Sequence, residues 1–260
     1  MKLQAPLTDI HNHLLPAVDD GAQSFAEAVR HLKALHAEGV AQLCVSPHLF
    51  GWLIDEPGAF ARQHESLENA FEEFAAACAE RTDVPRLFFG QEILCQTPEI
   101  ARRVFTEAHP GYRGTRYALV EFGFELKDDP TAIVHEILDT GRRMIVSHPE
   151  RYRRNRTPVQ LEELRRWKAA GALLQVNVGS LLGDYGTGAE TLAWQALSEG
   201  LADLVSTDHH ADARIASPQA AVARISQRGS AEIARLLLSE NTARVLADQD
   251  LLPVPPLAAR

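Results

Sequence analysis

Two histidines one residue apart, His11 and His13, lie in the segment TDIHNHLLPAVDDGA, residues 8–22. Alternate residues of a β-strand point to the same side, so the two imidazoles would project together and could hold one metal ion. Asp208 and His210, in STDHH, repeat this spacing near the other end of the chain. Imidazole suits zinc, iron, manganese or nickel, and carboxylates shift the preference toward manganese and magnesium. The pattern therefore indicates a metal site.

Seven short runs rich in β-branched and aromatic residues recur along the chain, with helical patterns between most of them. The runs are LTDIHNH, QLCVSPH, RLFFGQEI, YALVEF, MIVSHPE, LLQVNVGS and DLVSTDHH. Strand–helix alternation with short connections predicts an α/β protein with a parallel sheet. Because no Gly/Ser-rich linker divides the chain, we expect a single domain over residues 1–248, followed by a proline-rich tail, 249–260. Seven units favour a barrel over an open sheet.

Six of these runs end in His, Asp or Glu, and the ends beyond the two pairs above are His48, Glu92, Glu121 and His148. In an α/β barrel the carboxyl ends of the strands carry the active site. A cluster made only of buried histidines and carboxylates would leave charges unpaired, which is costly. We therefore expect these side chains to converge on metal.

The remaining histidines and the helix boundaries have simpler interpretations. Five histidines in predicted helices or loops are interpreted as surface or packing residues: His31, His36, His64, His109 and His135. For His209, both a packing role and contact with substrate remain open. Ser24 and Glu27 have the spacing of a capping box. Three dipeptides look like an N-cap before proline at the first helical position: Asp129-Pro130, Thr157-Pro158 and Ser217-Pro218. Left-handed helix ends are expected at Gly39, Gly141, Gly171 and Gly200.

The motifs TDIHNHLLPAVDDGA, SPHLFGW, GQEI, LVEFG, SHPERY, NVGSLLGDYG and STDHH, in this order, resemble the PHP (polymerase and histidinol phosphatase) superfamily. They resemble most its manganese-dependent protein-tyrosine phosphatases of bacterial capsule and exopolysaccharide gene clusters. The resemblance runs from about residue 8 to residue 246 and implies a distorted (β/α)7 TIM-like barrel, the PHP fold. It also implies three divalent metal ions, with manganese expected and iron, zinc, cobalt or magnesium as alternatives. The implied ligands are His11, His13, Asp20, His48, Glu92, Glu121, His148, Asp208 and His210.

The resemblance further implies two arginines that bind phosphate. Arg151, three residues beyond His148, matches the family's phosphate-binding arginine. Arg214 resembles a second one, although its loop DHHADARIAS departs from the family's asparagine-containing, proline-rich segment. One ion is expected to take His11, His13, Glu92 and Asp208, and Asp19 is expected to support a ligand or to cap the following helix.

The implied reaction is hydrolysis of a phosphate monoester, with a metal-bound water as nucleophile and no residue assigned as general acid. A covalent cysteine intermediate is not expected. Thiol-based tyrosine phosphatases share a Cys-x5-Arg loop, and the sixth residues after the three cysteines here are Phe50, Val84 and Ala101. A phosphotyrosine protein is the expected substrate, and the resemblance alone implies the tail of a polysaccharide-synthesis tyrosine kinase.

Three alternatives remain open at this point. The substrate could be small, such as histidinol phosphate or a nucleotide-like phosphate. An amidohydrolase also opens with HxH on its first strand, but it typically uses a carboxylated lysine at a strand end, and none of the four lysines falls there: Lys2, Lys33, Lys127 and Lys168. A non-catalytic metal-binding module would usually have an eroded ligand set.

Composition restricts the setting in which the protein works. The formal net charge of −9 argues against a non-specific nucleic-acid binder. Three cysteines without a CxxC pair indicate a reducing compartment. Polar residues come early for a signal peptide, and no apolar run approaches the ~20 residues of a membrane span. We therefore expect a cytoplasmic protein.

Overall fold

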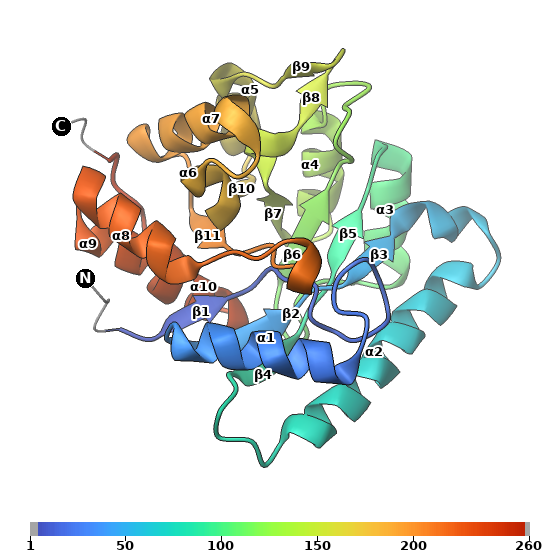
Figure 1. Cartoon of the computed structure of the whole chain (residues 1–260). Helices are drawn as coiled ribbons and strands as arrows, with labels where there is room; N and C mark the ends of the chain where they lie inside the picture. The colour runs from blue at the N-terminus through green and yellow to red at the C-terminus, as the bar shows by residue number, and fades with distance from the viewer. Residues whose placement is uncertain (1–4, 258–260) are drawn as a thin grey trace.

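Parallel strands form the centre of the molecule, and helices lie around them (Figure 1). The computed structural model describes residues 5–257, so residues 1–4 of the expected domain and 258–260 of the expected tail lie outside the described residues. The strands are β1 (Leu7–Asp9), β2 (Val40–Val45), β3 (His48–Phe50), β4 (Arg86–Phe89), β5 (Glu92–Leu94), β6 (Tyr117–Glu121), β7 (Arg143–Ser147), β8 (Arg153–Arg154), β9 (Thr157–Pro158), β10 (Leu173–Asn177) and β11 (Leu204–Ser206).

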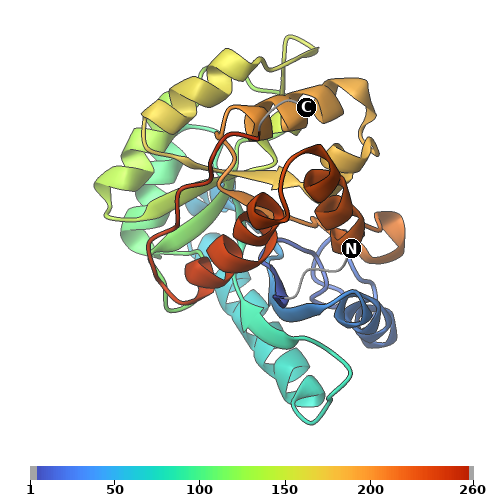
Figure 2. The same ribbon diagram turned by 90° about the vertical axis from the view of Figure 1, so that its left-hand side faces the viewer.

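The helices follow the strands in the expected alternation, and in Figure 2 they again surround the strands. The α-helices are α1 (Phe25–Ala37), α2 (Ala59–Cys78), α3 (Pro98–Glu107), α4 (Thr131–Asp139), α5 (Leu161–Ala169), α6 (Val178–Leu182), α7 (Gly186–Ser198), α8 (Pro218–Arg228), α9 (Ala231–Arg235) and α10 (Asn241–Leu246). Short 3-10 turns are η1 (Gly51–Asp55), η2 (Pro149–Arg151) and η3 (Ala211–Ala213), and η4 (Leu236–Glu240) is a π-helical turn.

All seven predicted strand runs form strands, and they pair in parallel. Among residues 5–257 they make a sheet with the order β1-β2-β4 and a sheet with the order β11-β10-β7-β6-β5-β3. An isolated bridge between Asn12 and His209 links the residues that follow β1 and β11, and thereby the two sheets. The structure thus has a single mixed α/β domain with parallel sheets, and these pairings do not by themselves close a barrel.

Two of the predicted runs are split, and this split moves their second halves into the larger sheet. The second run breaks between Val45 and His48, where Pro47 has no amide hydrogen to donate to a ladder. The third run breaks at Gly90, where an added Cβ would lie 2.6 Å from the ring of Tyr112. His48 and Glu92, the residues that follow the two breaks, are paired in register across β3 and β5.

Most of the expected helix boundaries are confirmed. The Ser24 side chain accepts a hydrogen bond from the Glu27 amide, whereas the Glu27 carboxylate accepts one from Gln23 rather than from Ser24. The four expected left-handed glycines all have positive φ. Ser217 caps α8 before Pro218.

Two of the three proposed Pro-containing helix starts were wrong in detail. Thr157-Pro158 forms β9, which pairs antiparallel with β8, and α5 begins only at Leu161 after a capping box at Gln160. Near α4, the Asp129 side chain accepts a hydrogen bond from Thr131, and Pro130 is the residue that precedes the helix. The prolines therefore indicated correctly that an element begins nearby, but they did not indicate whether it is a helix or a strand.

The chain after α10 has no regular secondary structure up to residue 257, but it packs against the domain. In Figure 2 this segment, drawn in red, runs along the outside of the strands. Leu257 is buried and its amide donates to the Leu197 carbonyl at 3.0 Å. The fully buried Asn241 donates to the carbonyls of Asp203 and Leu252 and accepts from the Leu252 amide.

We predict that Asn241→Ala lowers the free energy of unfolding by about 2–3 kcal/mol, because it leaves buried backbone groups without partners. Urea denaturation followed by circular dichroism measures the change. Asn69→Ala, at an exposed position on α2, is the matched control and should stay within about 0.5 kcal/mol of the parent. Equal stability of the two variants would contradict a fastening role for Asn241.

Candidate metal centre

The predicted site residues converge at the carboxyl ends of the parallel strands. His11 and His13 follow β1, Glu121 ends β6, and His148 follows β7. Seven of the nine predicted ligands, both arginines, Phe124, Tyr185 and Ala213 line one pocket of about 370 Å³. The other two, His11 and His13, are fully buried beside it. The pocket is called the main pocket below.

Two buried carboxylates, Glu92 and Asp208, lie at the centre of the cluster, and each is 1% exposed. His11 Nε2 lies 3.3 Å from a Glu92 oxygen and 3.4 Å from an Asp208 oxygen. His13 Nε2 lies 3.4 Å from the other Glu92 oxygen and 3.6 Å from Asp208. These are the four residues expected to share one ion, and the structure brings their ligand atoms together.

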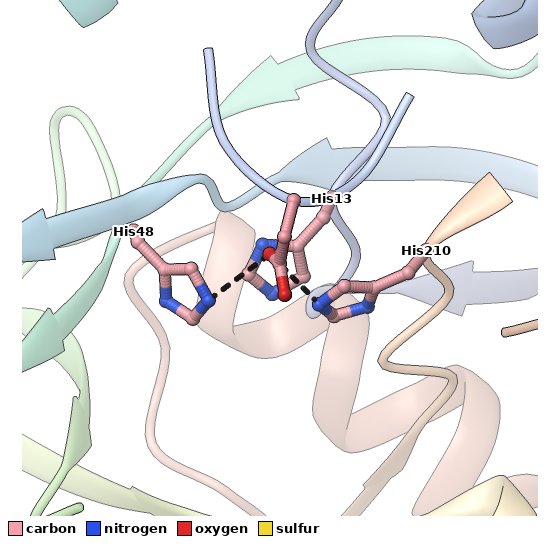
Figure 3. Close-up of side chains that lie close together, drawn as sticks. His13, His48 and His210 are labelled. Atoms are coloured by element: carbon pink, nitrogen blue, oxygen red, sulfur yellow. Dashed lines mark ion pairs between the residues drawn. The ribbon is translucent and has the colours of Figure 1, made fainter. Parts of the chain in front are cut away.

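A second group lies toward the surface and is formed by His13, His48, His210 and Asp20. Figure 3 shows the three imidazoles turned toward one another, and its dashed lines mark ion pairs. Asp20 Oδ1 lies 3.4 Å from His48 Nε2 and 3.3 Å from His210 Nε2. Two further groups overlap with these, namely His11/His148/Asp208 and His48/Glu92/Glu121. Because members are shared, the ligand atoms form one continuous cluster.

The two histidines after β1 are held with one ring nitrogen toward the cluster. His13 Nδ1 lies 2.7 Å from Asp19 Oδ2, and His11 Nδ1 lies 2.7 Å from Gln175 Oε1. Both partners are acceptors, so in the neutral ring Nδ1 carries the proton and Nε2 keeps the lone pair. Within residues 5–257, Nε2 of His11 and of His13 has no hydrogen-bond partner. Unpartnered lone pairs facing buried carboxylates are the arrangement that a metal ion fits.

The close approach of carboxylates and imidazoles dominates the electrostatics of the cluster. Burial alone would lower the pKa of His13, but Asp19 and Glu92 raise it to about 9. Burial would also lower the pKa of His48, and Asp20 and Glu92 raise it to about 11. Burial, together with repulsion from Glu92, raises the pKa of Glu121 to about 7. The carboxylates thus favour a second proton on these imidazoles, and a divalent cation bound at the same ring nitrogens would take the place of that proton.

Both predicted arginines reach the floor of the main pocket. Arg151 Nη1 lies 2.6 Å and Arg214 Nη1 lies 3.1 Å from the same oxygen, Asp208 Oδ2. The Arg151 guanidinium is also 4.7 Å from the Phe124 ring centroid and 4.3 Å from that of Tyr185. The unusual loop around Arg214 therefore does not displace this side chain from the pocket.

His209 and His31 form a hydrogen-bonded chain outside the metal cluster. His209 Nδ1 accepts from the Ala216 amide at 3.2 Å, so its Nε2 carries the proton and donates to His31 Nδ1 at 2.9 Å. His31 Nε2 then donates to Asp212 at 3.0 Å. His31 is thus a packing residue, as interpreted, but a buried one that ties α1 to the loop carrying Arg214. This chain also answers the question about His209, which faces α1 and not the pocket.

Sequence reasoning missed several residues that shape the site. Gln175 and Asn177 occupy alternate positions on β10, and the side-chain amide of Asn177 donates to Asp208 at 2.7 Å. Six of the seven runs end in His, Asp or Glu, and the run that contains β10 does not. In that run, two amide side chains at alternate positions were the feature that could have indicated a contribution to the site. Tyr185 falls inside the motif NVGSLLGDYG and Phe124 directly follows the motif LVEFG, but nothing local distinguishes either from an ordinary packing residue.

The backbone is constrained where the cluster is built. His148 and Asp208 have φ of 32° and 52°, in the left-handed region that non-glycine residues rarely adopt. Gly21, in the DDG turn, packs so closely that an added Cβ would lie 1.8 Å from the His13 carbonyl oxygen. The glycine lets the loop that carries Asp19 and Asp20 lie directly against the His13 backbone.

Together, the fold and the site define an α/β protein with a histidine–carboxylate centre at the carboxyl ends of its parallel strands. The family model described as "Capsular polysaccharide synthesis, CpsB/CapC" matches residues 7–247. The chain belongs to this CpsB/CapC family.

Individual relatives agree with this assignment. CapC of Staphylococcus aureus is 30% identical over 78% of this chain and 77% of that protein. Tyrosine-protein phosphatase YwqE of Bacillus subtilis is 26% identical over 96% of this chain and 95% of its own. One chain from the crystal structures of YwqE and of CpsB from Streptococcus pneumoniae, described as metal-dependent tyrosine phosphatases, superposes with a TM-score of 0.80. It is 24% identical and covers 98% of this chain and 100% of that chain, so this likeness establishes the fold.

No helix among the described residues is long and apolar enough to span a membrane.

We predict that Gly21→Ala lowers the free energy of unfolding by about 3 kcal/mol, because the methyl group has no space beside the His13 backbone. Thermal or urea denaturation measures the loss. Gly188→Ala on α7 is the control, since its Cβ would meet only Pro158 at 3.4 Å and the helix gains propensity. A stable Gly21→Ala protein would show that the turn can move away from His13.

Proposed function

We propose that this protein is a metal-dependent phosphatase that hydrolyses phosphotyrosine in proteins. The observation that carries the proposal is the single main pocket, in which the histidine–carboxylate cluster and two arginines face each other. The names of the relatives CpsB and YwqE, both tyrosine-protein phosphatases, support it. The finer assignments proposed with it are a distorted (β/α)7 barrel over residues 1–248, a tail from residue 249, and a cytoplasmic location.

The proposed ligands are His11, His13, Asp20, His48, Glu92, Glu121, His148, Asp208 and His210, and we propose three divalent ions, with manganese as the native metal. The mixed imidazole and carboxylate donors support this choice over softer ions. The unpartnered Nε2 atoms of His11 and His13 support the assignment of those rings. When bound, such ions would lower the pKa of water to supply a nucleophile near neutral pH and would neutralise charge on a phosphate.

The protein's own side chains then bind and orient the phosphate. Arg151 and Arg214 converge on one oxygen of Asp208, so both guanidinium groups are within reach of an anion on the pocket floor. Their fork of N–H donors matches phosphate oxygens. The Asn177 side-chain amide donates to this same Asp208 oxygen, so the carboxylate keeps a hydrogen-bond donor when the arginines turn to substrate.

The walls of the main pocket favour an aryl phosphate. Phe124, 46% exposed, stacks on the His148 ring with a centroid distance of 5.4 Å and leaves its outer edge at the pocket. Tyr185 lines the same pocket across Arg151. Two aromatic walls beside a phosphate-binding floor suit a tyrosyl ring better than an aliphatic chain such as that of histidinol phosphate.

We predict that the purified protein releases phosphate from a phosphotyrosine peptide, that chelation abolishes this activity, and that manganese restores it. The physical reason is that the ligand cluster alone supplies no nucleophile. Phosphate release measured before chelation, after it and after addition of manganese tests the point. Histidinol phosphate and a nucleotide monophosphate serve as comparison substrates. Turnover of these two, with none of the peptide, would replace the phosphotyrosine assignment by a small-molecule phosphatase.

A second prediction separates metal binding from catalysis. Gln175→Met removes the acceptor that fixes the His11 ring, so manganese affinity should fall about 10- to 100-fold. Isothermal titration calorimetry of metal-free protein gives the affinity directly. Gln195→Met, the same substitution at an exposed position on α7, should bind manganese like the parent. Unchanged affinity in Gln175→Met would rule out His11 as an oriented ligand.

A further inference from the structure

A second pocket adjoins the main pocket and is larger, with a volume of about 500 Å³. We call it the side pocket. The two pockets share Phe124, Arg151 and Tyr185 in their walls. A substrate whose phosphate reaches Arg151 from the main pocket therefore has the side pocket as its immediate neighbour. A free aryl phosphate would leave that space empty.

The side chains that separate the two pockets are held in place by close packing. Tyr185 lies directly over Gly179, where an added Cβ would be 2.8–2.9 Å from the tyrosine ring and hydroxyl. The Arg151 guanidinium is held between the Tyr185 and Phe124 rings at 4.3 and 4.7 Å. Both rings stack on the same guanidinium, so Arg151, the proposed phosphate-binding residue, also forms the edge of the side pocket.

The inner wall of the side pocket offers a buried hydrogen-bond acceptor. Glu150 is 1% exposed, and its Oε1 accepts hydrogen bonds from the backbone N–H of Asn177 at 2.9 Å and from the Ser180 hydroxyl at 2.6 Å. Its Oε2 has no partner among residues 5–257. A buried carboxylate oxygen left without a donor is costly, so a donor supplied by a ligand would be well matched here. A peptide N–H is such a donor.

The outer wall of the side pocket offers positive charge. Arg153 lines the pocket and is exposed, and its guanidinium donates only to the Arg156 carbonyl. No carboxylate lies within ion-pairing distance of Arg153 in the described part of the chain. Its neighbour Arg154, in contrast, pairs with Glu163 at 2.9 Å. An anionic side chain of a ligand would therefore find Arg153 available.

We propose that the side pocket binds the residue next to phosphotyrosine in an extended peptide, with a backbone N–H donating to Glu150 Oε2 and an acidic side chain facing Arg153. The inference rests on the proposed phosphatase function and adds to it a substrate class: phosphotyrosine within a chain, beside a carboxylate. The protein then selects its substrate partly outside the pocket that holds the phosphate.

The test compares kcat/KM of the manganese-loaded protein for para-nitrophenyl phosphate and for blocked peptides with Glu, Ala or Lys beside phosphotyrosine, on either side. We expect Glu to be preferred over Lys by about 3- to 5-fold on one side, the upper range for an exposed ion pair. Arg153→Ala should reduce this ratio to below about twofold, and Arg153→Lys should retain most of it. Arg62→Ala should keep the parent ratio, because Arg62 is another exposed arginine that has no carboxylate partner among residues 5–257.

Two further variants test occupancy of the side pocket itself. Gly188→Leu places a side chain beside Pro158 in the pocket wall, and it should lower the ratio of peptide to para-nitrophenyl phosphate turnover about tenfold. Thr187→Leu, exposed on the same helix turn outside the pocket, should not. Glu150→Gln keeps an acceptor for Asn177 and Ser180 but replaces the free acceptor by a donor, so it should lower the same ratio.

The outcomes separate the two proposals. Hydrolysis of para-nitrophenyl phosphate, with peptide turnover indifferent to the neighbouring residue and to Arg153 or Gly188, would overturn the side-pocket inference and leave the phosphatase intact. A preference for Lys over Glu would overturn the acidic substrate class. Absence of hydrolysis with every substrate would overturn the proposed function, and this inference with it.

Discussion

Two carboxylates buried at the end of a parallel sheet, Glu92 and Asp208, are the constraint around which the site is built. An ionised carboxylate that is 1% exposed needs compensating charge or hydrogen bonds. Asp208 receives them from Arg151, Arg214 and Asn177, and Glu92 receives them from imidazoles on either side. Apart from Arg214, which lies six residues after Asp208, these partners come from distant parts of the chain, so the charges are compensated only when the strands have assembled.

The sheet places these groups by a simple rule with two exceptions. Parallel strands end on one side, and the residues at or just after the ends of β1, β6, β7 and β11 therefore meet there. His48 and Glu92 arrive differently, because Pro47 and Gly90 break their runs and shift β3 and β5 onto the larger sheet. The two breaks thus place the paired strands β3 and β5 at the cluster, although the sequence predicts only seven strand-forming runs.

Support for the cluster lies one layer further out. Asp19 and Gln175 fix two imidazoles, and the chain from Ala216 through His209 and His31 to Asp212 holds the loop that follows Asp208. Arg151 connects the histidine–carboxylate cluster to the side pocket, because its guanidinium belongs to the walls of both pockets. In the proposed function, one side chain therefore joins phosphate binding to selection of the surrounding peptide.

The order of strands and helices, the residue types of the cluster and both arginines could be predicted from the sequence, because period-2 apolar runs and long motifs are local properties of the chain. The tertiary structure alone decided which nitrogen of His11 and His13 faces the cluster, where His209 points, how the broken runs divide between the sheets, and that a second pocket adjoins Arg151. It also showed Thr157-Pro158 to be a strand. Each of these depends on contacts between residues far apart in sequence, such as His11 with Gln175, and side-chain direction at such contacts is set by packing that no local pattern encodes.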